Sequence, residues 1–128
     1  MMFPFAFRGF DLSGYDLILS NKSGFCHSVQ VHPGATHICY CLTPTRYVWN
    51  LDDYIQREGF NPAVSALLRP LIRILQQWDR RACKGVDHFI AISSAVQRRI
   101  ALVYNRDSVI IHPPVEIDRF SPVEKPHD

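Results

Sequence analysis

Residues 86–94 read VDHFIAISS, and this stretch decides the fold class. Apolar residues dominate its first seven positions without regular polar alternation, which predicts a buried strand over residues 86–92. Ser93 and Ser94 follow as an N-cap pair, and residues 95–104 carry apolar side chains at helical spacing. A strand that leads directly into a helix is the repeating unit of α/β folds.

Three more apolar runs extend this pattern. Strands are predicted at residues 16–19, 37–42 and 108–111, and the three consecutive apolar residues of the first predict burial on both of its faces. A short helix or irregular segment is expected over residues 25–31. Because strands that alternate with helices favour right-handed crossovers, the sequence predicts an α/β fold with a parallel sheet and helices on both faces.

The longest predicted helix begins at Asn61 and Pro62, a good N-cap followed by the residue favoured at the first helical position. One apolar stripe then recurs at three- and four-residue spacing. Pro70 lies inside the run and lacks a backbone donor, so we expect a kink or a break there. Gly85 is the expected stop. The stripe comprises Val64, Leu67, Leu68, Leu71, Ile72, Leu75, Trp78 and Ala82.

The chain has 128 residues, the length of one small domain or of part of a larger one. Its 14 Lys and Arg against 12 Asp and Glu give a net charge of +2, which argues against a nucleic-acid binder driven by overall charge. Four cysteines without a recognisable signal peptide argue against a secreted disulfide scaffold. No apolar stretch is long enough to cross a membrane. These features predict a cytoplasmic protein with reduced thiols.

Two features indicate a partial domain. Neither G-x-G-x-x-G nor G-x-x-x-x-G-K-[ST] occurs, although a complete doubly wound domain normally opens with a strand and a glycine-rich phosphate loop. Residues 115–128 combine proline and charge with little periodicity, which is typical of a linker. We therefore expect an internal piece of a larger protein, with a partial domain over residues 1–114 and an interdomain linker over residues 115–128.

Four sequence blocks follow one another in a specific order. They are FDLSGYDLI at residues 10–18, HICYCLTPTRYVW at 37–49, DHFIAIS at 87–93 and VIIHPPVEIDRF at 109–120. This order resembles bacterial group 1 glycosyltransferases, most closely their mannosyltransferase-like branch. The resemblance covers most of the chain, and several ordered blocks are more specific than any single short motif.

The resemblance implies a GT-B architecture, in which two Rossmann-like domains face each other across a cleft. This chain is similar to the latter part of the N-terminal, acceptor-side domain, an incomplete half without the donor-binding domain. The resemblance implies a retaining hexosyltransferase in polysaccharide biosynthesis, which moves mannose from GDP-mannose, a nucleotide sugar, to a glycan or lipid-linked acceptor. It implies no cofactor, no metal and no nucleic-acid partner, and it implies that this piece alone is inactive.

Two positions depart from the family pattern. Members read YCHTP where this chain has Leu42, and they read Trp-Asp where it has Asn50. The family histidine is thought to contact the donor sugar, whereas Leu42 can neither donate a hydrogen bond nor carry charge. The alternative function is therefore a catalytically silent acceptor-binding or remnant domain without its donor-binding half.

The predicted substrate-binding residues are concentrated in residues 43–50, which leave a strand at its carboxyl end, where ligands gather in parallel sheets. Arg46 is the sharpest candidate because a guanidinium binds phosphate oxygens in pairs. An exposed arginine stacked on Tyr47 or Trp49 is the alternative. Tyr47 and Trp49 either stack on a sugar face or pack beneath the segment. Thr43 belongs to the same predicted set.

Ser93 and Ser94 complete that set. They open a helix at the end of a strand, where free N–H groups favour an anion, and a plain N-cap is the favoured alternative. Lys22 and Ser23 fall in a predicted polar loop over residues 20–24, where we expect a solvated lysine.

Three potential metal ligands, His37, Cys39 and Cys41, share one face of a predicted strand. Three ligands on a flat strand splay too far apart for zinc, and a fourth ligand is missing. We therefore interpret Cys39 and Cys41 as small core residues and predict no metal site.

Four arginines, Arg69, Arg73, Arg80 and Arg81, lie off the apolar stripe of the longest helix. They could form a basic face toward an anionic bilayer, since related enzymes often act on lipid-linked acceptors at the inner face of the membrane. An ordinary solvated helix face is the favoured alternative.

Overall fold

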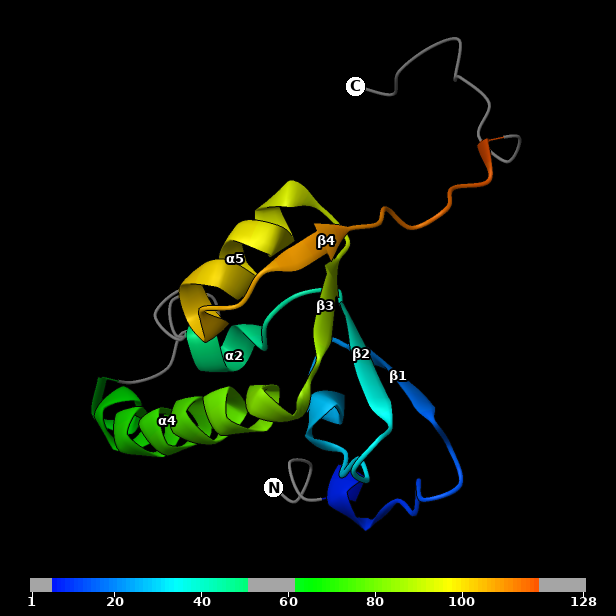
Figure 1. Cartoon of the computed structure of the whole chain (residues 1–128). Helices are drawn as coiled ribbons and strands as arrows, with labels where there is room; N and C mark the ends of the chain where they lie inside the picture. Colours follow the sequence, from blue (N-terminus) through cyan, green and yellow to red (C-terminus); the bar gives the residue numbers. More distant parts are fainter. Residues whose placement is uncertain (1–5, 51–61, 118–128) are drawn as a thin grey trace, which may run out of the picture.

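The structure, a computed structural model, describes residues 6–50 and 62–117. The described part forms a four-stranded sheet of order β1-β2-β3-β4, in which every neighbouring pair is parallel (Figure 1). The predicted α/β class with a parallel sheet is therefore confirmed. The strands are β1 (Leu17–Lys22), β2 (Thr36–Cys41), β3 (His88–Ala91) and β4 (Ser108–Ile110).

Helical segments connect the successive strands, close to where the sequence predicts them. The short helix expected over residues 25–31 is a single 3₁₀ turn, and the segment after β2 opens with one turn of α-helix. The helical segments are η1 (Phe7–Gly9), η2 (Cys26–Ser28), α2 (Arg46–Trp49), α4 (Pro62–Ala82), η3 (Cys83–Gly85) and α5 (Ser94–Tyr104).

One face of the sheet carries the core. The register pairs Ser20 with Cys39, and Cys39 with Phe89, so alternate residues of neighbouring strands share that face. The helices α2, α4 and α5 all lie on this side (Figure 1), because right-handed crossovers between strands in chain order stay on one side. The expectation of helices on both faces is wrong for the described residues. The core comprises Cys39, Cys41, Cys83, Val86, Phe89, Ala91, Val96 and Ile100.

The opposite face of the sheet is open along its edges. Leu17 and Leu19 in β1 are 60% and 69% exposed, and Val109 in β4 is 66% exposed. The prediction that residues 16–19 are buried on both faces is wrong, because β1 is an edge strand with only alternate residues covered. Ile38 and Ile90, on the inner strands, are half-buried.

The longest helix, α4, continues through Pro70, so the expected break does not occur. Asn61, its expected N-cap, lies outside the described residues, as do the side chains at positions 64 and 67. Ile72 and Asp79 are buried, whereas Leu71 is 43% exposed. The buried stripe is therefore rotated away from Leu71 and includes a carboxylate.

Helix α5 has the cap residues that its sequence predicts. The Ser93 hydroxyl accepts a hydrogen bond from the Val96 N–H at 3.3 Å. At the other end Asn105 adopts a left-handed conformation with φ of 52°, and its N–H donates to the Ala101 carbonyl. Residues 111–116 contain no helix or strand, and residues 118–128 of the predicted linker lie outside the described part.

No helix within residues 6–50 and 62–117 combines the length and apolar character needed to cross a membrane.

Candidate functional site

The segment after β2 carries most of the predicted site residues, and hydrogen bonds fix it in place. The Thr45 hydroxyl donates to the carbonyl of Gly24 at 3.1 Å, and the Gln76 amide donates to the carbonyl of Val48 at 2.8 Å. Val48 itself is fully buried. The segment is thereby held between the loop after β1 and helix α4, which explains why an aromatic and partly polar stretch forms a turn of helix.

A hollow of about 160 Å³ lies between α2 and α5, and we call it the arginine hollow. Arg46 from α2 and Arg99 from α5 both line it, and the lining residues within the described part of the chain include no acidic side chain. Three predicted site residues, Thr43, Arg46 and Trp49, come together here. Arg99 was missed, because nothing in the helical pattern of residues 95–104 distinguishes one exposed arginine from another. The described residues that line it are Thr43, Pro44, Arg46, Trp49, Asn50, Arg99, Leu102 and Val103.

Tyr47 faces a second hollow, of about 230 Å³, which we call the aromatic hollow. The Tyr47 and Phe25 rings meet edge to face, with centroids 5.9 Å apart. The side chains of consecutive residues in a helix point about 100° apart, so Arg46 and Tyr47 line different hollows. The described residues that line it are Phe7, Asn21, Ser23, Gly24, Phe25, Cys26 and Tyr47.

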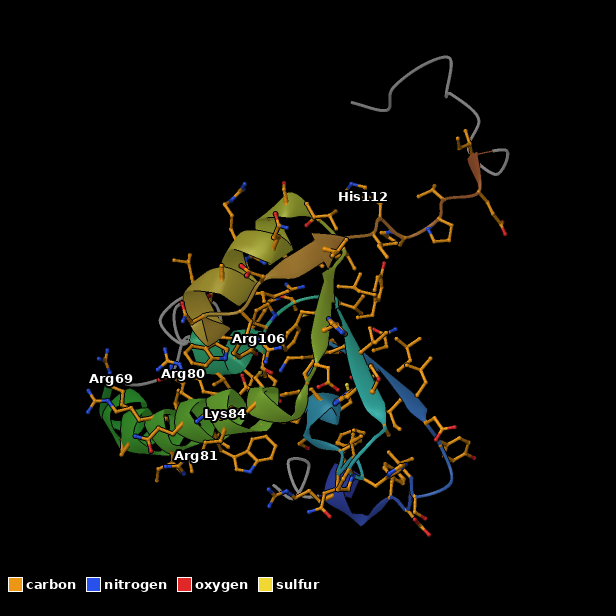
Figure 2. All side chains as sticks on the ribbon, viewed as in Figure 1. Arg69, Arg80, Arg81, Lys84, Arg106 and His112 are labelled. Atoms are coloured by element: carbon orange, nitrogen blue, oxygen red, sulfur yellow. The ribbon has the colours of Figure 1, made fainter. Side chains whose placement is uncertain are left out.

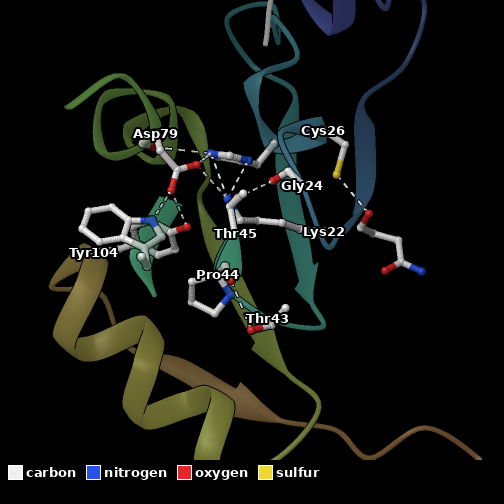
Figure 3. A network of polar contacts seen from close by, with 11 residues as sticks. Lys22, Gly24, Cys26, Thr43, Pro44, Thr45, Asp79 and Tyr104 are labelled. Atoms are coloured by element: carbon white, nitrogen blue, oxygen red, sulfur yellow. Dashed lines mark hydrogen bonds and ion pairs between the residues drawn. The ribbon is translucent and has the colours of Figure 1, made fainter. Parts of the chain in front are cut away.

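Asp79, in α4, is a fully buried carboxylate within a network of polar contacts (Figure 3). Its Oδ1 is 3.1 Å from Lys22 Nζ and 3.1 Å from His27 Nε2. Its Oδ2 accepts hydrogen bonds of 2.7 Å from the Trp49 indole and 2.7 Å from the Tyr104 hydroxyl. These five residues, the Asp79 cluster, join β1, η2, α2, α4 and α5.

The contacts define the protonation states of the Asp79 cluster. Burial alone would raise the pKa of Asp79, but the His27 hydrogen bond and the Lys22 charge outweigh it and hold this pKa well below its usual range. Burial lowers the pKa of His27, which is therefore neutral. A neutral His27 can donate from Nε2 to Asp79 and accept at Nδ1 from Lys22, 2.9 Å away. Burial raises the pKa of Tyr104 far above its usual range, so it remains a donating phenol.

The cluster changes the interpretation of two residues. Lys22 is fully buried at the end of β1, so the expected solvated loop lysine is wrong. Trp49 is held by Asp79 on one side, and the Arg80 guanidinium lies 4.8 Å from its ring centroid. The arginine stacked on Trp49 is therefore Arg80. Arg46 itself is exposed at the arginine hollow.

A third hollow, of about 310 Å³, lies where α4 and α5 end, with Arg80, Lys84 and Arg106 around it (Figure 2). Two of the cations around it donate hydrogen bonds to backbone carbonyls. Arg106 Nη2 donates to the Val86 carbonyl at 2.7 Å, and Arg80 Nε donates to the Val103 carbonyl at 3.0 Å. Cations at helix C-termini stabilise the unpaired carbonyls there, so we interpret this hollow as structural.

Two predicted site residues, Ser93 and Ser94, line neither the arginine hollow nor the aromatic hollow. Ser93 acts as the N-cap of α5, and Ser94 is its exposed first residue. Leu42 is half-buried directly after β2, and its N–H donates to the Lys22 carbonyl at 2.8 Å. Asn50, the other departure from the family pattern, lines the arginine hollow.

The predicted zinc-like trio does share one buried face of β2. His37 Nδ1 donates to the Gly85 carbonyl at 3.0 Å, and its Nε2 accepts from the Ser20 hydroxyl at 2.9 Å. Cys39 and Cys41 lie in the core, where burial raises the pKa of their thiols to about 11 and about 12. In the part of the chain that the structure describes, no His, Cys, Asp and Glu side chains form a group that could hold a metal ion.

No protein-family model matches the chain, and neither the curated proteins nor the solved structures contain a match.

Proposed function

We propose that this chain is part of a glycosyltransferase that moves a sugar, mannose, from a nucleotide sugar to a polysaccharide or lipid-linked acceptor. The observation that carries the proposal is the arginine hollow, where Arg46 and Arg99 from two different elements line one cavity directly after a strand of a parallel sheet. Thr43 and Pro44 of its lining follow the carboxyl end of β2, the edge of a parallel sheet at which ligands bind. Two guanidinium groups with no carboxylate among the described lining residues favour a phosphate-bearing ligand.

Sugar transfer from a nucleotide sugar requires positive charge near the departing diphosphate. As the glycosidic bond breaks, negative charge develops on the departing diphosphate, and fixed cations stabilise it in the transition state. Trp49 offers a rigid wall for the hollow, since Asp79 and Arg80 hold its ring. The other contacts to the nucleotide come from a donor-binding domain outside this chain.

A second candidate function is a silent acceptor-binding or remnant domain. Leu42 favours it, because an apolar side chain replaces the family histidine that contacts the donor sugar. Under this alternative the two hollows bind an acceptor without turnover.

A third observation supports peripheral contact at the inner face of the membrane. Arg69, Arg73, Arg80 and Arg81 are exposed on α4, and the apolar Ile74 on the same helix is 64% exposed. A basic helix with exposed apolar side chains suits an anionic bilayer surface. The labelled Arg69 and Arg81 extend from α4 in Figure 2.

The test is transfer of labelled mannose from GDP-mannose to a lipid extract by the complete gene product, with the 128-residue chain as the comparison. We expect transfer by the complete product and none by the chain alone. Arg46→Ala should abolish most of the transfer, whereas Arg98→Ala, a change of an exposed arginine outside the hollow, should not. A complete product without transfer would favour the silent alternative. Transfer that is equal in wild type and Arg46→Ala would overturn the role of the hollow.

A further inference from the structure

The aromatic hollow is built differently from the arginine hollow. Three rings, those of Phe7, Phe25 and Tyr47, line it together with the polar Asn21 and Ser23, and none of the lining residues that the structure describes carries a charge. The aromatic hollow thus lacks arginines like those that would bind a phosphate in the arginine hollow. A ligand of this hollow must be uncharged and must offer both an apolar surface and hydrogen-bonding groups.

The walls of the hollow are rigid. Phe25 is buried and meets Tyr47 edge to face on one side and Trp78 on the other, with the Trp78 centroid 5.3 Å away. Tyr47 retains 36% of its surface exposed. The Cys26 thiol donates to the carbonyl of Asn21 at 2.9 Å, which fixes the floor. The Tyr47 ring is thus in contact with Phe25 and still partly exposed, which makes it a preformed stacking surface.

We propose that the aromatic hollow is a carbohydrate subsite that takes one uncharged pyranose ring of the acceptor glycan. The C–H face of a pyranose is apolar and packs on an aromatic ring, and its hydroxyls pair with neutral polar groups such as Ser23 and the neighbouring backbone. The volume of about 230 Å³ lies below the ~300–1,000 Å³ of pockets for drug-sized ligands, so the hollow suits one ring. This assignment rests on the proposed function and names the acceptor class for it.

Each of the two hollows would then bind a different substrate. Arg46 and Tyr47 are neighbours in α2, and each lines a different hollow. The one-turn helix would hold a charged group on one side and a neutral sugar ring on the other. That arrangement suits a transfer between a phosphate-bearing donor and a neutral acceptor.

Cys26 provides a probe within the hollow. It is half-buried there, whereas the other three cysteines, Cys39, Cys41 and Cys83, are 0–2% exposed. Native alkylation with iodoacetamide, followed by mass spectrometry, should therefore modify Cys26 first. Burial raises the pKa of the Cys26 thiol, so the reaction is run at mildly alkaline pH to supply thiolate.

We expect methyl α-mannopyranoside to slow Cys26 alkylation in a saturable manner, with a Kd of about 1–10 mM, as is usual for one sugar ring at an open site. At ten times the Kd the rate should fall about tenfold if the bound form is protected. Mannitol, an open-chain polyol without a pyranose ring, should protect much less. An alkylation rate that is unchanged by the glycoside, or equal protection by mannitol, would overturn the subsite.

Variants test the stacking role of Tyr47. Tyr47→Phe keeps the ring and should retain most of the protection, whereas Tyr47→Ala should lose it. Tyr15→Ala is the matched control, because Tyr15 is exposed and does not line the hollow. Should Tyr47→Ala fail to fold, Ser23→Ala removes one exposed hydroxyl of the lining and should weaken protection several-fold.

The outcome is separable from that of the transfer assay. Protection without transfer by the complete gene product would leave the subsite standing and refute the transferase. Transfer without protection would refute the subsite and leave the transferase standing.

Discussion

The indole N–H of Trp49 donates a 2.7 Å hydrogen bond to Oδ2 of Asp79, a carboxylate with no exposed surface. The two residues are 30 positions apart and belong to α2 and α4. Their contact connects the wall of the arginine hollow to a buried ion pair. The geometry of the hollow therefore depends on a buried charge behind its wall.

The first prediction concerns Asp79 itself. Asp79→Asn removes the negative charge and leaves the Lys22 ammonium buried without its counter-charge, which typically costs ~3–5 kcal/mol of unfolding free energy. Urea unfolding measures the loss. Asp107→Asn, at an exposed position, is the control and should change stability by less than ~0.5 kcal/mol. A loss below ~1 kcal/mol for Asp79→Asn would contradict the importance of the ion pair.

The second prediction concerns pH. Burial lowers the pKa of His27 and of His37 in the folded state. Between the folded pKa and the unfolded value of about 6.5, the unfolded chain binds more protons, so stability falls as the pH drops through this window. The slope approaches ~1.4 kcal/mol per pH unit for each histidine. Below about pH 4, the depressed pKa of Asp79 adds a further loss, because the unfolded chain takes up its proton first.

Melting temperatures from pH 8 to pH 3 measure this dependence. His27→Gln should flatten the curve between about pH 6.5 and the lowered pKa that His27 has in the folded state. A melting temperature that rises as the pH falls from 7 to 5 would show that the sign is wrong.

Local patterns predicted much of this fold. The positions of β2, β3, β4 and α5 follow from apolar runs, an N-cap serine and helical spacing, all of which depend on near neighbours in the chain. The strand order does not follow from such patterns. Because the strands follow one another in chain order, right-handed crossovers place the described helices on one side of the sheet. The prediction of helices on both faces was therefore wrong for these residues.

The Asp79 cluster was missed although part of its signal is present. Ile18, Ser20 and Lys22 alternate at strand spacing, so extending β1 by three residues places Lys22 on the buried face. Ile72, Leu75 and Asp79 likewise fall at helical spacing. The pairing of Lys22 with Asp79 spans 57 residues and requires the tertiary structure.

The third prediction concerns the open face of the sheet. Exposed apolar side chains on an edge strand favour self-association, so we expect the isolated chain to form oligomers or aggregates. Leu19→Lys should weaken association ~10-fold or more, since burying a leucine contributes ~1.5–3 kcal/mol. Leu102→Lys is the control, because Leu102 is 82% exposed on α5, away from that face. Sedimentation velocity measures both, and a monodisperse wild-type monomer would contradict the prediction.

The fourth prediction concerns Leu42 in the complete gene product. If the family histidine contacts the donor sugar, Leu42→His should raise transfer from GDP-mannose by a few-fold, about the value of one hydrogen bond at ~0.5–1.5 kcal/mol. The half-buried position leaves part of the imidazole accessible. Leu42→Phe supplies a ring without hydrogen bonding and should give no gain. Equal or lower transfer in a well-folded Leu42→His variant would show that Leu42 is not a defect.

The last prediction separates Arg46 from Arg80 in the complete gene product. If Arg46 binds a phosphate, Arg46→Ala should lose ~2–4 kcal/mol of transition-state stabilisation, read from kcat/KM. Arg46→Lys should restore little, because an ammonium lacks the paired donors of a guanidinium. Both variants should melt within about a degree or two of wild type, because an exposed side chain adds little to the core. Arg80→Ala should behave oppositely, since it loses the stack on Trp49 and the bond to the Val103 carbonyl, and its melting temperature should fall by several degrees. A fall in melting temperature for Arg46→Ala with kcat/KM near wild type would instead assign Arg46 a packing role.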